Sequence, residues 1–418
     1  MKHVFKWLGI AVATPIVLFL LLAMALYIPA VQNFLVQKTT ERLSQETGLS
    51  ISIERVRLAF PLDLAVHGVQ ALDGRDTLVA ARSLRLDVAF WPLFEGRADI
   101  EGVGLYDAQV NTKSYLPDLH IRGRVGELSA ASHGVEWNKG RVLLDHATLA
   151  DADLHIALSD TAAPDTTAET PLAWVIDVPK VDIRRSTVRL SLPGDSLHVA
   201  ATLGKAALRD GRFDLGTPHY ALRSLSIKDG FIDYVAGKPQ TILSAIDLPK
   251  GIQTPSVKGW ENAQHFDMNH ITLSDLTALV DTFSYDAKGV LRMGIRGISF
   301  RERCGLAVHR IAGSVYMDSA LLSLPSFLLR TEHSTLDASV HLPWKAMSEG
   351  KGGDLRLQLK GKVGHEDALT LASGFVEPQY AAAYPHQPLT LDADIHGNID
   401  HLVMDRVRCS LPGIIDFS

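Results

Sequence analysis

From Leu49 to the C-terminal residue, short runs alternate apolar with polar side chains. Ile51 and Ile53 begin the pattern, and Leu84, Leu86 and Val88 continue it. Because successive side chains of a β-strand point to opposite faces, this period of two predicts strands with one apolar and one polar face. Gly, Pro and Asp separate the runs. The chain is therefore expected to be mainly β.

A longer unit recurs six times within this pattern. Two alternating apolar residues precede a central pair, usually Asp and a small residue, and two more follow it. The central pairs are Asp107-Ala108, Asp151-Ala152, Arg185-Ser186, Asp210-Gly211, Asp229-Gly230 and Asp275-Leu276. A hairpin turn at each pair would bring the flanking apolar residues together, and a one-residue bulge in a single bent strand would also return them to one face. Either alternative predicts an elongated, curved antiparallel sheet that forms an apolar groove.

A second layer that would cover this apolar face is hard to find in the sequence. Aromatic residues make up 7% of the chain, which is low for a β-sandwich of this size, and few segments look like a covering layer. An uncovered apolar face needs an apolar occupant, and acyl chains would serve. The candidate wall residues are Ile183, Val188, Leu190, Phe213, Ile227 and Ile232.

The N-terminal segment predicts a membrane anchor. Residues 7–30 contain no charge and would span about 36 Å as a helix, enough to cross a bilayer. Basic residues precede the segment, which places the N-terminus in the cytoplasm and the bulk of the chain in the periplasm. The expected interface residues are Lys2, Lys6, Trp7 and Tyr27. The alternative is a signal peptide cleaved near Ala23-Met24-Ala25, but the apolar run is longer than the apolar region of about 7–15 residues in a typical signal peptide.

These features divide the chain into five parts. Helical spacing over residues 31–48 predicts a short amphipathic helix that ends at Gly48. The parts are a cytoplasmic tip and transmembrane anchor (1–30), the amphipathic helix (31–48), a first β-groove segment (49–158), a Thr-rich acidic loop or insertion (159–171) and a continuing β-groove segment (172–418) that ends in mid-pattern.

Composition and motifs favour a protein without a catalytic or metal site. The net charge of −6 gives no reason to expect nucleic acid as a partner. The only cysteines, Cys304 and Cys409, are far apart, and a disulfide between them is left open. The 17 histidines are scattered, and the densest cluster, His365-Glu366-Asp367, is expected to be a solvated turn. Nothing indicates a cofactor.

One word of the sequence resembles an esterase motif. Residues 194–197 read GDSL, but apolar alternation on both sides predicts a hairpin turn there, and the only nearby histidine is His198. Catalysis at Ser196 is a remote alternative. Arginines such as Arg122 and Arg124 alternate with apolar residues, which places them on the wet face of strands and leaves headgroup contacts open.

The first quarter of the chain resembles the AsmA/TamB superfamily of Gram-negative envelope proteins. The similar segments are IPAVQNFLVQKTTERLSQETGLSISIERVRLAF (28–60) and LRLDVAFWPLFEGRADIEGVGLYDAQV (84–110), where a Leu-Phe-x-Gly turn at 93–96 leads into the first recurring unit. The resemblance implies an inner-membrane anchor followed by a periplasmic β-groove that conducts phospholipid between the membranes. It also implies, as an alternative, a scaffold for outer-membrane protein assembly or secretion with an Omp85-type barrel, which a TamB-type C-terminal domain would engage if the chain continues beyond Ser418.

Overall fold

The computed structural model describes most of the chain beyond residue 48. The described ranges are 48–59, 63–74, 76–89, 100–112, 119–136, 140–158, 174–192, 196–236, 266–348, 352–372 and 385–417, together with residue 350 and six residues between 37 and 45. The expected anchor, with Lys2, Lys6, Trp7 and Tyr27, lies outside the described residues, as does the candidate cleavage site. No helix among the described residues has the length and apolar character needed to cross a membrane.

A helix precedes the sheet and ends where the sequence predicts. The described residues between 37 and 45 are helical. Gly48 has a left-handed φ of 72°, and its N–H donates to the carbonyl of Ser44 at 3.0 Å. Glycine favours this C-terminal conformation because it has no Cβ to clash. The predicted stop at Gly48 is confirmed.

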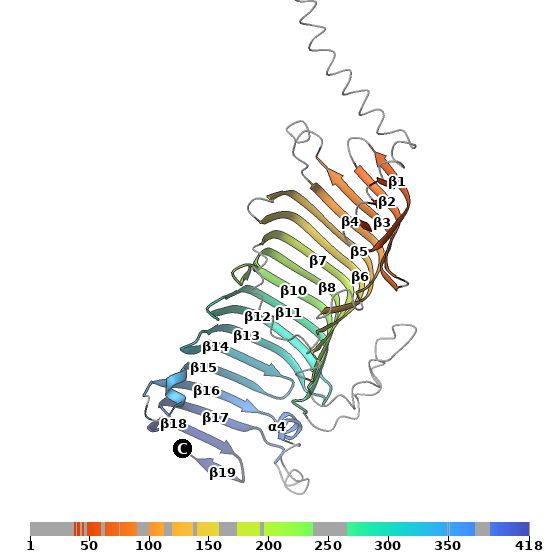
Figure 1. The fold of residues 1–418 in the computed structure, drawn as a ribbon. Helices are drawn as coiled ribbons and strands as arrows, with labels where there is room; N and C mark the ends of the chain where they lie inside the picture. The colour runs from red at the N-terminus through yellow and green to blue at the C-terminus, as the bar shows by residue number, and fades with distance from the viewer. Residues whose placement is uncertain are drawn as a thin grey trace, which may run out of the picture.

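The rest of the described chain forms one sheet of 19 strands, drawn from red to blue in Figure 1. The strands are β1 (Ser50–Ala59), β2 (Asp63–Asp73), β3 (Asp76–Val88), β4 (Ile100–Asn111), β5 (Leu119–Glu136), β6 (Arg141–Leu158), β7 (Val175–Leu192), β8 (Leu197–Asp214), β9 (His219–Leu222), β10 (Ser224–Ala236), β11 (His270–Asp286), β12 (Leu291–Glu302), β13 (Ala307–Met317), β14 (Leu321–Thr331), β15 (Thr335–Pro343), β16 (Leu355–Val363), β17 (Leu389–Gly397), β18 (Leu402–Leu411) and β19 (Ile415–Phe417). The prediction of a mainly β chain with one long sheet is confirmed.

Strands that follow one another in the chain lie side by side. β9 and β10 are two parts of one interrupted strand: both pair with β8 and with β11. One pairing differs from the expected antiparallel sheet. β6 and β7 are parallel, with Leu149 opposite Ile183. Residues 159–173, between them, therefore connect opposite ends of two 18-residue strands, which a hairpin loop does not do.

The six recurring units are bends within single strands, so the hairpin alternative is wrong. Each unit lies inside one strand, and the first residue of each central pair has a left-handed φ between 43° and 53°. The bulge alternative is right about the single bent strand. In the first four units, however, the pairing register does not shift, so no extra residue is inserted. One left-handed residue is enough to restore the apolar side chains to one face.

Four of the left-handed residues form a line across the sheet, which we call the crease. β4, β6, β7 and β10 run in one direction and place Asp107, Asp151, Arg185 and Asp229 in it. β5 and β8 run the other way and place Gly126 and Gly204 opposite them. A Cβ at Gly126 would lie 2.7 Å from that of Asp151, and one at Gly204 would lie 2.7 Å from that of Asp229. Gly126 and Gly204 therefore leave no room for a Cβ beside Asp151 and Asp229.

Two short helices lie at the margins of the sheet. The expected solvated turn at His365-Glu366-Asp367 is instead the start of helix α4 (His365–Ala372). Asp367 is buried and accepts hydrogen bonds from the hydroxyls of Thr331 and Ser334, which fixes the helix to the β14–β15 turn. The 3-10 helix η5 (Trp344–Met347) buries Ala346 completely. The helical spacing at α4 spans too few residues to be recognised in the sequence.

Both cysteines are free thiols. Cys304 follows β12 and Cys409 lies in β18, with five strands between them. At about 4.8 Å per strand the two are roughly 29 Å apart, whereas a disulfide needs Cα atoms within about 7 Å. The open question of a disulfide within the chain is answered in the negative.

Candidate functional site

One face of the sheet carries unbroken cross-strand rows of apolar side chains. The first row runs from β2 to β18 through directly paired residues: Leu64, Leu86, Val103, Ala130, Ala147, Val181, Leu208, Leu225, Val280, Ile295, Gly313, Phe327, Ala338, Leu359, Ala393 and Val407. No polar side chain interrupts it.

A second apolar row lies two residues away on the same face. It comprises Val56, Val66, Leu84, Leu105, Leu128, Leu149, Ile183, Ala206, Ile227, Ala278, Ile298, Ile311, Leu329, Leu336, Gly361, Leu391, Cys409 and Phe417. Most of its members are only partly buried, and Leu128 is 45% exposed. A continuous apolar surface whose side chains remain partly exposed to solvent is unusual for a folded chain in water.

The crease turns this apolar face inward. Small residues beside the crease are buried although no second layer covers them in the described part of the chain: Ala108 is 1% and Ala152 3% exposed. Larger side chains from both arms of the bent strands pack over them, Leu105 and Leu149 from one arm and Leu154 from the other. The left-handed residues Asp107 and Asp151 are exposed on the opposite side. The apolar side is therefore the inside of the bend, in agreement with the bowed strands in Figure 1.

All six predicted wall residues lie on this inner face, and five of them belong to β7 and β10. Ile183 and Ile227 belong to the second row, separated by Ala206. Val188 and Ile232 lie beyond the crease, separated by Ala201. Leu190 is one step further out, opposite Val199. All five are partly buried, so each presents some apolar surface to solvent.

Phe213 lies apart from the other five, near the opposite end of the bent strands. It pairs with Tyr220 across β8 and β9, with ring centroids 6.5 Å apart. Tyr220 stacks in turn on Tyr285 of β11 at 6.5 Å. The left-handed residue Asp210 and an ion pair between Asp210 and Arg223 mark a second bend beside this aromatic group. The structure thus brings Phe213 to the apolar face at a separate place.

The outer face is polar and dense in ion pairs. Arg141 and Asp177 lie 2.6 Å apart, Lys180 and Asp182 lie 3.0 Å apart, and Arg189 contacts Asp153. These pairs are partly exposed, and each contributes little to stability. These ion pairs keep the outer face of the sheet polar and hydrated, whereas the inner face is apolar.

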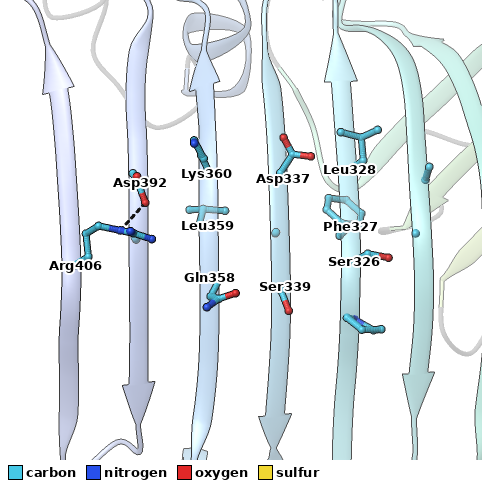
Figure 2. Close-up of a pocket in the computed structure, with 15 residues that line it drawn as sticks. Ser326, Phe327, Leu328, Asp337, Ser339, Gln358, Leu359, Lys360, Asp392 and Arg406 are labelled. Carbon is cyan, nitrogen blue, oxygen red and sulfur yellow. Dashed lines mark ion pairs between the residues drawn. The ribbon is translucent and has the colours of Figure 1, made fainter.

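A hollow of about 510 Å³ lies over β13 to β18. Figure 2 shows its lining, with Arg406 reaching Asp392 at 2.9 Å. Asp337, Lys360 and Asp392 form a cross-strand row of alternating charge. Opposite charges on neighbouring strands stabilise a sheet face, and the charges offset one another here. The hollow therefore offers no net charge for a ligand.

Among the described residues, the GDSL motif is not accompanied by a catalytic Ser–His arrangement. Ser196 lies in the turn before β8 with a φ of 50°. Nδ1 of His198 lies 3.0 Å from Oγ of Ser191, so this imidazole is bonded to a different hydroxyl. Within the described ranges, no group of three His, Cys, Asp or Glu side chains is arranged to hold a metal ion.

Two features of the sheet were not predicted from the sequence. Gly126 and Gly204 are spaced like ordinary strand glycines, and only the pairing register reveals why they are needed. His120, His155 and His198 are far apart in the chain, yet the sheet gathers them at one end of β5, β6 and β8.

No family model matches the chain, and no curated protein matches it at a significant level.

Proposed function

We propose that this chain carries phospholipid along the apolar face of its sheet, between the inner and outer membranes and without catalysis. The observation that carries the proposal is the pair of apolar rows that continue from β1 or β2 to β18 or β19 with no covering layer in the described residues. Acyl chains are the occupant that such a long, narrow apolar surface suits.

The energetics favour sliding over tight binding. Each methylene group that moves from water onto the apolar face gains about 0.8 kcal/mol, which offsets part of the cost of leaving a bilayer. Neighbouring positions in the second row are chemically alike, for example Ile183, Ala206 and Ile227. A lipid that moves from one strand to the next therefore meets similar contacts and no deep trap. Headgroups remain in water at the strand ends.

The lipid content of the purified full chain tests the proposal. We expect phospholipid to copurify with the wild type, and Ile183→Asp with Ile227→Asp to lose most of it because two charges interrupt the second row. The matched control changes the neighbouring outer-face residues, Arg184→Asp with Lys228→Asp, and should keep the lipid. Equal lipid in both double variants, or none in the wild type, would contradict lipid carriage.

A second candidate function is a scaffold for outer-membrane protein assembly, supported by the exposed apolar residues of β18. Within the described residues, only Cys409, Ser410 and Leu411 of β18 pair with β19. Leu402, Val403 and Met404 are between 46% and 61% exposed. An apolar, unpaired strand edge suits β-strand addition by a partner. Copurification of an outer-membrane barrel that Met404→Pro abolishes, with no lipid extracted, would favour this candidate over lipid carriage.

A further inference from the structure

A cationic cluster lies on the outer face at one end of four adjacent strands. We call this end, where β5 and β8 begin and β6 and β7 end, the first rim. The cluster comprises His120 and Arg122 of β5, His155 of β6, Arg189 and Ser191 of β7, and His198 of β8. Cross-strand pairing places Arg122 opposite His155 and His155 beside Arg189, and it places Ser191 opposite His198. Six residues from four strands therefore share one small area.

Donors converge in the middle of this cluster. The Ser191 hydroxyl is buried and lies 3.0 Å from Nε2 of His155 and 3.0 Å from Nδ1 of His198. His120 bonds to Asn111 at 3.1 Å, and Arg189 is paired with Asp153. Arg122 forms no ion pair with any described residue and is exposed. Asp153 is the one carboxylate of the described residues that contacts the cluster, so positive charge is in excess.

The positive charges of the cluster affect the pKa of His155, which lies at its centre. Partial burial lowers the pKa of His155, and the positive charges of Arg189, His120, His198 and Arg122 lower it further. A site that resists a further positive charge is one that would gain from a bound anion.

The opposite end of the same strands, the second rim, differs. Arg141 lies 2.6 Å and Arg212 lies 3.5 Å from Asp177, so the two arginines share one carboxylate. His133 is paired with Asp145 as well. Both rims belong to the same strands and border the same apolar inner face. The first rim has two arginines and one carboxylate, whereas the second rim has two arginines and two carboxylates.

We propose that the first rim binds a phosphate group, and that this phosphate belongs to the headgroup of a phospholipid whose acyl chains lie on the inner face. The lipid source rests on the proposed function, and the phosphate site does not. Ile156, Leu190 and Val199 line the inner face at the level of the rim. A lipid with its chains over these residues brings its headgroup to the strand ends, and its phosphate reaches Arg122 and the histidines by passing round those ends to the outer face. The rim thus selects phosphate-bearing lipids and fixes which way the headgroup points.

Titration calorimetry on the full chain, held in lipid-free amphipol at low salt, tests both parts. The first probe is inorganic phosphate. We expect Arg122→Gln to weaken its binding about fivefold or more, because a charge-assisted donor is lost, and we expect Arg212→Gln at the second rim to leave it unchanged. Equal effects of the two variants, or no phosphate binding by the wild type, would overturn the site.

The second probe is dihexanoylphosphatidylglycerol below its critical micelle concentration. We expect it to bind the wild type more tightly than inorganic phosphate does, and Leu190→Asn, on the inner face at the level of the rim, to reduce it to the level of phosphate alone. If the chains add nothing, the site binds free phosphate, and both the headgroup source and lipid carriage are wrong. If Leu190→Asn weakens the binding of the lipid and Arg122→Gln does not, lipid carriage stands and the rim site falls. Unchanged circular dichroism shows that each variant is folded.

Discussion

Asp151 of β6 and Arg185 of β7 both have left-handed backbone, and the guanidinium of Arg185 donates to both carboxylate oxygens, at 2.6 and 2.7 Å. This contact holds the pKa of the Asp151 carboxyl below its usual value. It also explains why the third recurring unit carries Arg where the others carry Asp. β6 and β7 are parallel, so their left-handed residues lie side by side, and two aspartates there would repel.

The left-handed positions should tolerate glycine and reject β-branched residues. We expect Asp229→Val to lower the free energy of unfolding by about 1–2 kcal/mol, because a β-branched side chain is strained at positive φ. Asp229→Gly should change it by less than about 0.5 kcal/mol. Urea unfolding of the full chain measures both. Lys228→Val, next in sequence with ordinary extended backbone, is the control. A loss as large at Lys228 as at Asp229 would argue against the bend.

Gly204, which lies opposite Asp229, gives a sharper test. We expect Gly204→Ala to cost about 1–3 kcal/mol, because its Cβ would lie 2.7 Å from that of Asp229. Adding Asp229→Gly removes the second Cβ and should restore most of that loss. A double-mutant cycle in urea measures the coupling. Two losses that simply add would show that these residues do not meet.

His155 should make stability depend on pH. Its pKa is lowered in the folded chain, so between the folded and unfolded pKa values the unfolded state binds more protons. The resulting contribution is complete above about pH 6.5 and is lost as the pH falls through the folded pKa. Comparing unfolding at pH 7.5 and 5.5, we expect His155→Gln to lose less stability than the wild type. His219→Gln on β9 is the control and should behave like the wild type. A larger loss in His155→Gln would reverse the assigned sign.

Cys304 should be a poorly reactive thiol. Burial, together with a hydrogen bond to Glu302, raises its pKa from 9.0 to about 12, so roughly 1,000-fold less thiolate is present at neutral pH. We expect iodoacetamide at pH 8 to label Cys304 at least about tenfold more slowly in the folded chain than in urea. Mass spectrometry of the peptide follows the rate. Equal rates in the two states would place Cys304 in an exposed environment.

The alternation of side chains was enough to predict the strands, the apolar face and the position of each bend. Leu149, Asp151 and Leu154 illustrate the reason. The face on which each side chain lies follows from the alternation along its own strand, which can be recognised from neighbouring residues alone. The same residues left the nature of the bend open. A hairpin and a bent strand put Leu149 and Leu154 on one face equally well, and only the pairing of β6 with its neighbours separates the two.

Contacts between segments that are far apart in the chain could not be predicted from the sequence. The parallel pairing of β6 with β7 depends on how the chain returns between Leu158 and Val175, for which alternation carries no signal. The gathering of His120, His155 and His198 depends on the register of four strands. Asp367 was expected in a solvated turn, because nothing nearby in the chain indicates that the hydroxyls of Thr331 and Ser334 donate hydrogen bonds to its carboxylate.

Photo-crosslinking at two adjacent positions of β10 addresses lipid carriage on the inner face directly. A benzophenone side chain at Ile227 faces the apolar rows, and one at Lys228 faces the opposite side of the same strand. After irradiation in cells and purification of the full chain, we predict phospholipid adducts at position 227 and none at position 228. Adducts at 228 alone, or equal adducts at both positions, would contradict a lipid path along the inner face.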